Sequence, residues 1–244
     1  YLDIDELDVT LGAGSKIQFG SADTDASQDM SIYATMPLKN IEIDNTSTNN
    51  PEVSLKTVAL EADTLTIATG ATFDGNGLDL TLNGDLVNNG TFTANSNSTY
   101  FSGTVNQQVT GTGTTNFYNL TYTGSLDFAI NDDVTVDHDF TQTGGTFTDN
   151  DNTLTVNGDI NFAGTHNWGG TSSGIYLNGT NQQIMTGAGT YGRLTIENAS
   201  GVKIDPNTGS GITITNELQL NEGIFDIDQY LLTLQTAASI TTTA

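Results

Sequence analysis

Acidic and amide side chains recur at short turns along the chain, with the spacing of oxygen ligands for a divalent cation. Carboxylate and amide oxygens two residues apart on a turn can converge on Ca²⁺, and stacked copies of the turn would add oxygens from neighbouring coils. Asp and Asn also satisfy turn geometry without a metal, and neither the EF-hand nor the glycine-rich nonapeptide pattern is complete. We therefore predict candidate calcium ligands, and no cofactor that the fold requires. The candidate ligands are Asp74, Asn76, Asp149, Asp151, Asp226 and Asp228.

The densest group of ionisable side chains lies in one short segment. Two carboxylates on either side of a glycosidic bond form the machinery of glycan hydrolases. The corresponding stretch near Ile212 keeps the apolar positions and lacks most of the charges, which favours a solvated loop. His138 and His166 are too few and too widely separated to indicate a zinc site. The group consists of Asp132, Asp133, Asp137, His138 and Asp139.

Other chemistry-bearing signals are weak. Trp168 and Tyr176 can stack on a sugar ring, although single aromatic residues in a loop more often serve packing. The chain has no nucleophile elbow and no phosphate-binding glycine loop with its lysine. It contains no cysteine, so disulfides and thiolate sites are excluded. We expect no catalytic residue, no cofactor-binding residue and no enzymatic activity.

The charge balance limits the classes of binding partner. The 244 residues carry 29 acidic and 5 basic side chains, for a formal net charge of −24. Nucleic-acid binding needs clustered lysine and arginine, and is therefore not expected. No apolar run reaches the length of a membrane span. An acidic surface suits a secreted, soluble protein, and any signal peptide or cell anchor is expected outside these residues.

The elements that position these residues are organised by internal repeats. LTLNGDLVNNGTF (80–92) returns as LTVNGDINFAGTH (154–166), and VNQQVTGTGTT (105–115) returns as TNQQIMTGAGT (180–190). The second match aligns Gln107 with Gln182. Leu154 corresponds in turn to Leu232. Long matches in the same order indicate duplication, and repeats of this kind are typical of solenoids or arrays.

The two ends of the chain also match each other. LDIDELDVTLGAGSKI (2–17) aligns with FDIDQYLLTLQTAASI (225–240). We expect one elongated solenoid over residues 1–244, which joins either further repeats of a longer chain or a second copy. Its predicted repeats are 2–72, 73–146 and 147–224, with a partial fourth at 225–244.

Apolar and polar residues alternate over short runs, as in Leu78, Leu80 and Leu82, or in Ile212 and Ile214. This is the period of a half-buried strand, and clusters of Gly, Asn, Asp and Ser separate the runs. Helical periodicity is absent. The pattern predicts an all-β fold with essentially no helix, a parallel β-solenoid built from about three repeats of 71–78 residues.

The motifs VNQQVTGTGTTNFYNLTYTG (105–124) and TNQQIMTGAGTYGRLTI (180–196) resemble the β-strand repeats of giant bacterial surface proteins, including filamentous adhesins. The likeness covers the chain from about Leu55 onward and implies a right-handed parallel β-helix, export and a role at the cell surface.

We therefore expect an extracellular structural or adhesive repeat protein, whose open solenoid ends pair head to tail in a surface filament. Two alternatives remain open. One is a carbohydrate-active β-helix, such as a phage tailspike or a glycan hydrolase, and the other is a glycan-binding module without catalysis, with surface glycans as partners.

Overall fold

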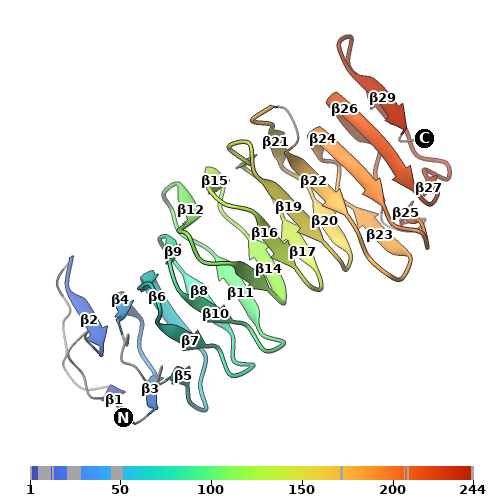
Figure 1. The fold of residues 1–244 in the computed structure, drawn as a ribbon. Coiled ribbons are helices and arrows are strands. Elements are labelled where there is room, and N and C mark those ends of the chain that lie inside the picture. The colour runs from blue at the N-terminus through green and yellow to red at the C-terminus, as the bar shows by residue number, and fades with distance from the viewer. Residues whose placement is uncertain are drawn as a thin grey trace. The chain divides into compact units, whose positions relative to one another are not determined.

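The computed structural model describes residues 2–4, 12, 14–20, 29–44, 52–170, 173–205, 207 and 209–242. In each unit, these residues form short parallel strands and turns without any helix, stacked as a β-solenoid with about 21 residues per turn (Figure 1). The prediction of an all-β parallel solenoid is confirmed. Residue contacts divide the chain into unit 1 (Tyr1–Tyr118) and unit 2 (Asn119–Ala244), and each unit is described by itself.

In unit 1, each turn of the chain adds short strands that pair in parallel with strands of the turns before and after it. One sheet has the order β1-β3-β5-β7-β10. A second set of parallel pairings joins β2, β4, β6, β8, β9, β11 and β12. The strands are β1 (Leu2–Ile4), β2 (Lys16–Phe19), β3 (Met30–Ala34), β4 (Leu38–Ile43), β5 (Glu52–Leu55), β6 (Leu60–Ile67), β7 (Thr72–Asp74), β8 (Leu80–Leu82), β9 (Leu86–Asn88), β10 (Thr91–Thr93), β11 (Ser98–Phe101), β12 (Gln107–Thr110) and β13 (Thr115–Phe117).

In unit 2, the strands stack into three rows. Row 1 contains β14 (Asn119–Tyr122), β17 (Phe140–Gln142), β20 (Ile160–Phe162), β23 (Gln183–Thr186), β25 (Val202–Ile204) and β27 (Phe225–Asp226). Row 2 contains β15 (Asp127–Ile130), β18 (Thr146–Thr148), β21 (Thr165–Asn167), the first halves of β24 (Thr190–Glu197) and β26 (Ile212–Glu222), and β28 (Leu232–Leu234). Row 3 contains β16 (Val134–Val136), β19 (Thr153–Val156), β22 (Gly174–Leu177), the second halves of β24 and β26, and β29 (Ser239–Thr242).

Alternation along each strand places the core. In β19, Leu154 and Val156 point inward and are fully buried, whereas Thr153 and Thr155 between them are half-buried. The inward side chains of successive turns stack on one another, as in Phe128 and Phe147, whose ring centroids lie 6.2 Å apart. Full burial of such a side chain stabilises the fold by about 1.5–3 kcal/mol, so the stacked core holds the turns together.

Aspartate side chains join successive turns in unit 2. Asp133 Oδ1 accepts a hydrogen bond from Thr153 N at 2.7 Å, and Asp139 Oδ1 accepts one from Asp159 N at 2.8 Å. Each carboxylate thus satisfies a backbone donor about one turn further along the chain, which would otherwise need water or another acceptor. Part of the acidic composition therefore has a structural role.

The sequence repeat is not a whole number of turns. Phe147 and Phe225 are equivalent in the repeat, yet Phe147 lies in row 2 and Phe225 lies in row 1. Leu154 and Leu232 likewise occupy row 3 and row 2. The reason is that the spacing between these equivalent positions is not a multiple of the turn length. The expectation that equivalent acidic turns stack on one another is therefore wrong for these two copies.

Buried glutamines correct one detail of the repeat. Gln107 Oε1 accepts a hydrogen bond from Gly103 N at 2.8 Å, and Gln183 Oε1 accepts one from Gly179 N at 2.9 Å. These matching bonds make Gln183, rather than Gln182, the counterpart of Gln107. The alignment inferred from sequence is thus wrong by a single position in this stretch.

Candidate functional site

A groove lies over the turns of unit 2 that lead from row 3 to row 1. Its volume is about 510 Å³, and carboxylate, amide and hydroxyl groups dominate its lining. Three successive turns contribute, between β16 and β17, between β19 and β20, and between β22 and β23. The lining residues are Asp137, His138, Asp139, Asn157, Gly158, Asp159, Asn178, Thr180, Asn181, Gln182 and Gln183.

Backbone hydrogen bonds hold the groove's carboxylates in place. Asp139 N donates to Asn119 Oδ1 at 3.1 Å, and His138 Nδ1 lies 3.0 Å from the same oxygen. Asp159 Oδ1 accepts a hydrogen bond from Ile184 N at 2.8 Å, one turn further on. Asp139 Oδ1 in turn accepts a hydrogen bond from Asp159 N at 2.8 Å. The carboxylates of Asp139 and Asp159 are therefore both held by backbone donors of the next turn, with amide groups around them that can bind hydroxyl-rich ligands.

The structure divides the acidic segment predicted from sequence. Asp137, His138 and Asp139 line the groove after β16, whereas Asp132 and Asp133 precede that strand. Asp132 Oδ1 accepts a hydrogen bond from Asp133 N at 2.9 Å. The five residues thus do not form one cluster.

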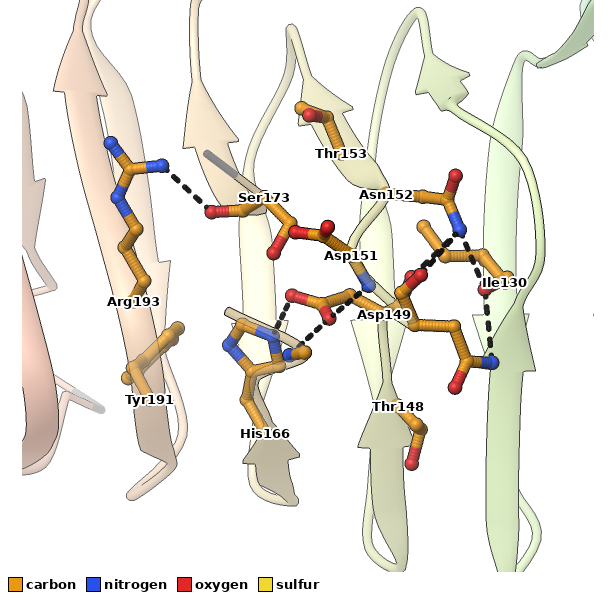
Figure 2. A network of polar contacts seen from close by, with 12 residues as sticks. Ile130, Thr148, Asp149, Asp151, Asn152, Thr153, His166, Ser173, Tyr191 and Arg193 are labelled. Carbon is orange, nitrogen blue, oxygen red and sulfur yellow. Dashed lines mark hydrogen bonds and ion pairs between the residues drawn. The ribbon is translucent and has the colours of Figure 1, made fainter. Parts of the chain in front are cut away.

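A buried ionisable pair lies elsewhere in unit 2, between β18 and β21 (Figure 2). His166 Nε2 donates to Asp149 Oδ2 at 3.0 Å, and neither side chain is exposed to solvent. Asp149 Oδ1 accepts hydrogen bonds from Gly169 N at 2.6 Å and from Asp151 N at 3.1 Å. The imidazole also packs on Phe147, with ring centroids 5.3 Å apart.

Burial alone would raise the pKa of the Asp149 carboxyl, because desolvation disfavours a charge. The hydrogen bonds from His166, Gly169 and Asp151 outweigh burial and hold that pKa below its ordinary value of 3.8. Asp149 is therefore ionised at neutral pH. Since His166 Nδ1 is buried without a hydrogen-bond partner, the pair serves to organise the core and shows no bond to a substrate-facing group in the described residues.

Arg193 lies in the neighbouring turn of the same region (Figure 2). It donates to Ser173 O at 2.9 Å and to the Tyr176 hydroxyl at 3.0 Å, and its Nε forms an ion pair with Glu217 at 2.9 Å. The guanidinium carbon also lies 5.5 Å from the centroid of the Tyr176 ring. Tyr176, predicted as a sugar-stacking candidate, is thus engaged by Arg193. Trp168, the other candidate, is half-buried, and its indole N–H is enclosed.

The candidate calcium ligands form separate turns. Asp74 Oδ1 accepts a hydrogen bond from Asn76 N at 2.6 Å, and Asp226 Oδ1 accepts one from Asp228 N at 2.9 Å. In both turns the second residue has a positive φ, 50° at Asn76 and 46° at Asp228. These bonds account for the recurrence of the acidic residues as turn formers.

Asp149 differs from these turn aspartates, because it points inward to His166. The carboxylates of Asp226 and Asp228 already have a cationic neighbour, since Lys203 lies 3.6 Å from Asp226 and 4.0 Å from Asp228. No group of three or more His, Asp or Glu side chains arranged to hold a metal occurs among the residues that the structure describes. Calcium binding stays a prediction, to be checked by melting the protein with calcium and with EDTA.

Comparison of the sequence repeats reveals a signal for the buried pair of Asp149 and His166. In the alignment that matches Leu80 with Leu154, His166 corresponds to Phe92 and Asp149 corresponds to Gly75. In unit 1, Phe92 stacks on Phe73 with ring centroids 6.0 Å apart. The ring contact itself is kept, because His166 packs on Phe147. A histidine at a phenylalanine position, together with an aspartate at a glycine position, is the sequence signal of the added hydrogen bond between His166 and Asp149.

No protein-family model, no curated protein and no solved structure matches the chain. The fold itself places the chain in the class of parallel β-solenoids. In the described part of the chain, no helix is long and apolar enough to cross a membrane.

Proposed function

We propose that this protein is an extracellular structural or adhesive repeat protein that works by extending its solenoid with a second copy of itself. The observation that carries the proposal is the exposed core of the last described turn. Leu234 pairs with Ile214 and Ile240 pairs with Leu218. Ile214 and Leu218 are 0% and 1% exposed, whereas Leu234 and Ile240 are 40% and 49% exposed.

The backbone of the same turn supports the proposal. Among the described residues, β27 pairs with β25, and β28 and β29 pair with β26, so each has a strand partner on one side. Unpaired parallel edges beside an apolar surface promote strand addition. One further turn would supply backbone partners and cover Leu234 and Ile240.

A second copy is the occupant that the chain itself favours. Residues 225–240 and 2–17 match in sequence, and they contain strands at the same spacing, with β27 and β29 on one side and β1 and β2 on the other. The chain therefore carries turn-forming segments of the same kind at both ends. Export is supported by the acidic composition and by the likeness to bacterial surface repeats. In this proposal the protein is not an enzyme.

The test is the size of the assembly in solution. We expect light scattering and negative-stain microscopy to show rods that lengthen with protein concentration. The double substitution Leu234→Asp and Ile240→Asp should return the protein to single copies. Leu126→Asp is the matched control, because Leu126 is 46% exposed and lies outside that turn, and it should assemble normally.

Uniform single copies of the wild-type protein at all concentrations would overturn the proposal, and would favour a further repeat of a longer chain as the occupant. Salt provides a second readout. With a net charge of −24 on each copy, repulsion opposes pairing at low ionic strength. Assembly through an apolar face should therefore strengthen as salt is added.

The groove of unit 2 favours glycan binding as a second candidate function. Its carboxylate and amide lining suits hydroxyl-rich ligands. Binding on a glycan array that is lost in the double variant Asn181→Ala and Gln182→Ala, with folding preserved, would support it. Both side chains are exposed, so truncation should not disturb the core. A wild-type protein that binds no glycan would rule it out.

A further inference from the structure

Row 2 of unit 2 presents one threonine from each of five successive turns at the same strand position. The register pairs Thr146 with Thr165, Thr165 with Thr190, Thr190 with Thr213, and Thr213 with Thr233. Strands in a parallel sheet lie about 4.7–4.9 Å apart, so the five side chains form a straight file at that spacing. We call the outward side of these strands the threonine face.

The positions two residues further along these strands do not form a second file. By sequence spacing they hold Thr148, Asn167, Gly192, Thr215 and Gln235. Thr148 Oγ1 donates to Asp127 Oδ1 at 2.7 Å, and Thr215 Oγ1 donates to Asn216 Oδ1 at 2.8 Å. The single file of five threonines is therefore the regular feature of the threonine face.

The hydroxyls of this file face solvent. Thr165 and Thr233 are exposed, and Thr146, Thr190 and Thr213 are half-buried. No hydrogen bond from these five side chains to another described residue is found. Threonine is stiff about χ1 because it is branched at Cβ, so the methyl and hydroxyl groups are held in a regular array before any ligand binds.

The threonine face carries no charge from Thr146 onward, although the protein has 29 acidic side chains. The outward positions of β18, β21 and β28 are threonine or asparagine. By contrast, row 1 is flanked by Asp139 and Asp159, and row 3 carries Arg193 and Glu217. Asp127 of β15 pairs with Thr146 and marks the charged edge of this face, and the uncharged stretch from Thr146 onward points to a neutral ligand.

We infer that the threonine face binds ice. Each position offers a hydroxyl that can join a water lattice and a methyl group around which water is ordered, and the short repeat of the sheet is close to a repeat of the ice lattice. The absence of charge is consistent with this ligand, because a charged group binds its own hydration shell tightly. Rigid strands lower the entropic cost of matching the lattice.

The same observations weigh against a polysaccharide on this face. Sugar rings are commonly bound by aromatic platforms, and the outward positions of β18, β21 and β28 carry none. The inference does not rest on assembly of the protein, because every residue of the face belongs to unit 2 of a single copy.

The test is the effect of the purified full chain on ice growth. We expect the wild-type protein to slow ice recrystallisation and to produce thermal hysteresis with faceted crystals. Thr190→Tyr places a bulky ring in the middle of the file and should abolish most of this activity. Thr141→Tyr is the matched control, because Thr141 is a half-buried, outward-facing threonine in row 1, and it should leave the activity unchanged.

Circular dichroism and melting temperature establish that both variants fold. Two further substitutions keep the inference open to refutation even if the tyrosine disturbs the strand: Thr190→Ser removes the methyl group, and Thr190→Val removes the hydroxyl, with little change in size. Each should weaken the activity. A folded wild-type protein without any effect on ice overturns the inference, as does equal loss in the Thr190→Tyr and Thr141→Tyr proteins. Binding to insoluble cellulose or chitin that Thr190→Tyr removes, without an effect on ice, would also overturn it.

Discussion

Substitution of Asp149 by alanine tests the role of the buried hydrogen-bonded pair of Asp149 and His166. The change removes the acceptor of three hydrogen bonds, from His166 Nε2, Gly169 N and Asp151 N. It leaves the imidazole buried with no partner at either nitrogen in the described structure, because His166 Nδ1 is already without one. A buried donor left without its acceptor costs about 1–3 kcal/mol, so we expect the loss of all three bonds to lower the free energy of unfolding of this region by about 3–5 kcal/mol.

The matched control is Asp74→Ala. Asp74 is a half-buried turn residue, and its Oδ1 accepts hydrogen bonds from Asn76 N and Asn95 Nδ2, each at 2.6 Å. Both donors can turn to water when the carboxylate is removed, so the expected cost is about 1 kcal/mol. The difference between the two variants therefore isolates the effect of burial.

The assay must resolve parts of the molecule, because stacked repeats can open locally. Urea unfolding followed by circular dichroism gives the overall effect, and hydrogen exchange at the amides of β18 and β21 locates it. The double variant Asp149→Gly and His166→Phe copies the pair found in unit 1 and should recover most of the lost stability. Equal losses in Asp149→Ala and Asp74→Ala would refute the reasoning.

The remaining predictions concern the same unit. Because the pKa of Asp149 is depressed in the folded protein, its contribution to stability is present above pH 3.8 and is lost as the pH falls through the folded value. Asp149→Asn should therefore reduce the dependence of stability on pH in acid unfolding measured by circular dichroism. An unchanged pH profile would contradict this. Gln183→Leu leaves Val156 O and Gly158 O without their side-chain donor and should cost about 2 kcal/mol in urea unfolding, whereas the exposed Gln182→Leu should be nearly neutral. Phe147→Ala should cost about 3–5 kcal/mol, and a loss as small as that of Gln182→Leu would show that the aromatic stack does not hold the turns together.

The strand pattern was readable from sequence because one side of each strand is buried. The alternation of Leu154 and Val156 with threonines indicates the two-residue period of a strand, and it shows which side of the strand is buried. The turn length was not readable, because the long sequence repeat is the stronger signal and spans several turns. The groove was found only in part, since its residues come from three turns that the sequence does not place side by side.

The sequence also did not fix the alignment of the repeats to the exact residue. Gln107 was matched with Gln182 instead of Gln183, because the loops before and after these residues differ in length between the repeats. The sequence comparison also matched Asp149 with Asp74, whereas the alignment of Leu80 with Leu154 matches it with Gly75. A shift of one residue along a strand turns a side chain from the surface to the core. Gln107 and Gln183 show that matched hydrogen bonds, rather than matched letters, settle the equivalence.

The mismatch between repeat and turn has a consequence for folding specificity. In a stack whose repeat equals one turn, every neighbour looks alike, and a strand can slip by a whole turn and still find a similar partner. Here Phe147 lies beside His166 and Phe225 lies beside Val202, so copies of one motif meet different neighbours. A slipped pairing would place unlike side chains together, and the growing chain therefore has one register in which its core closes.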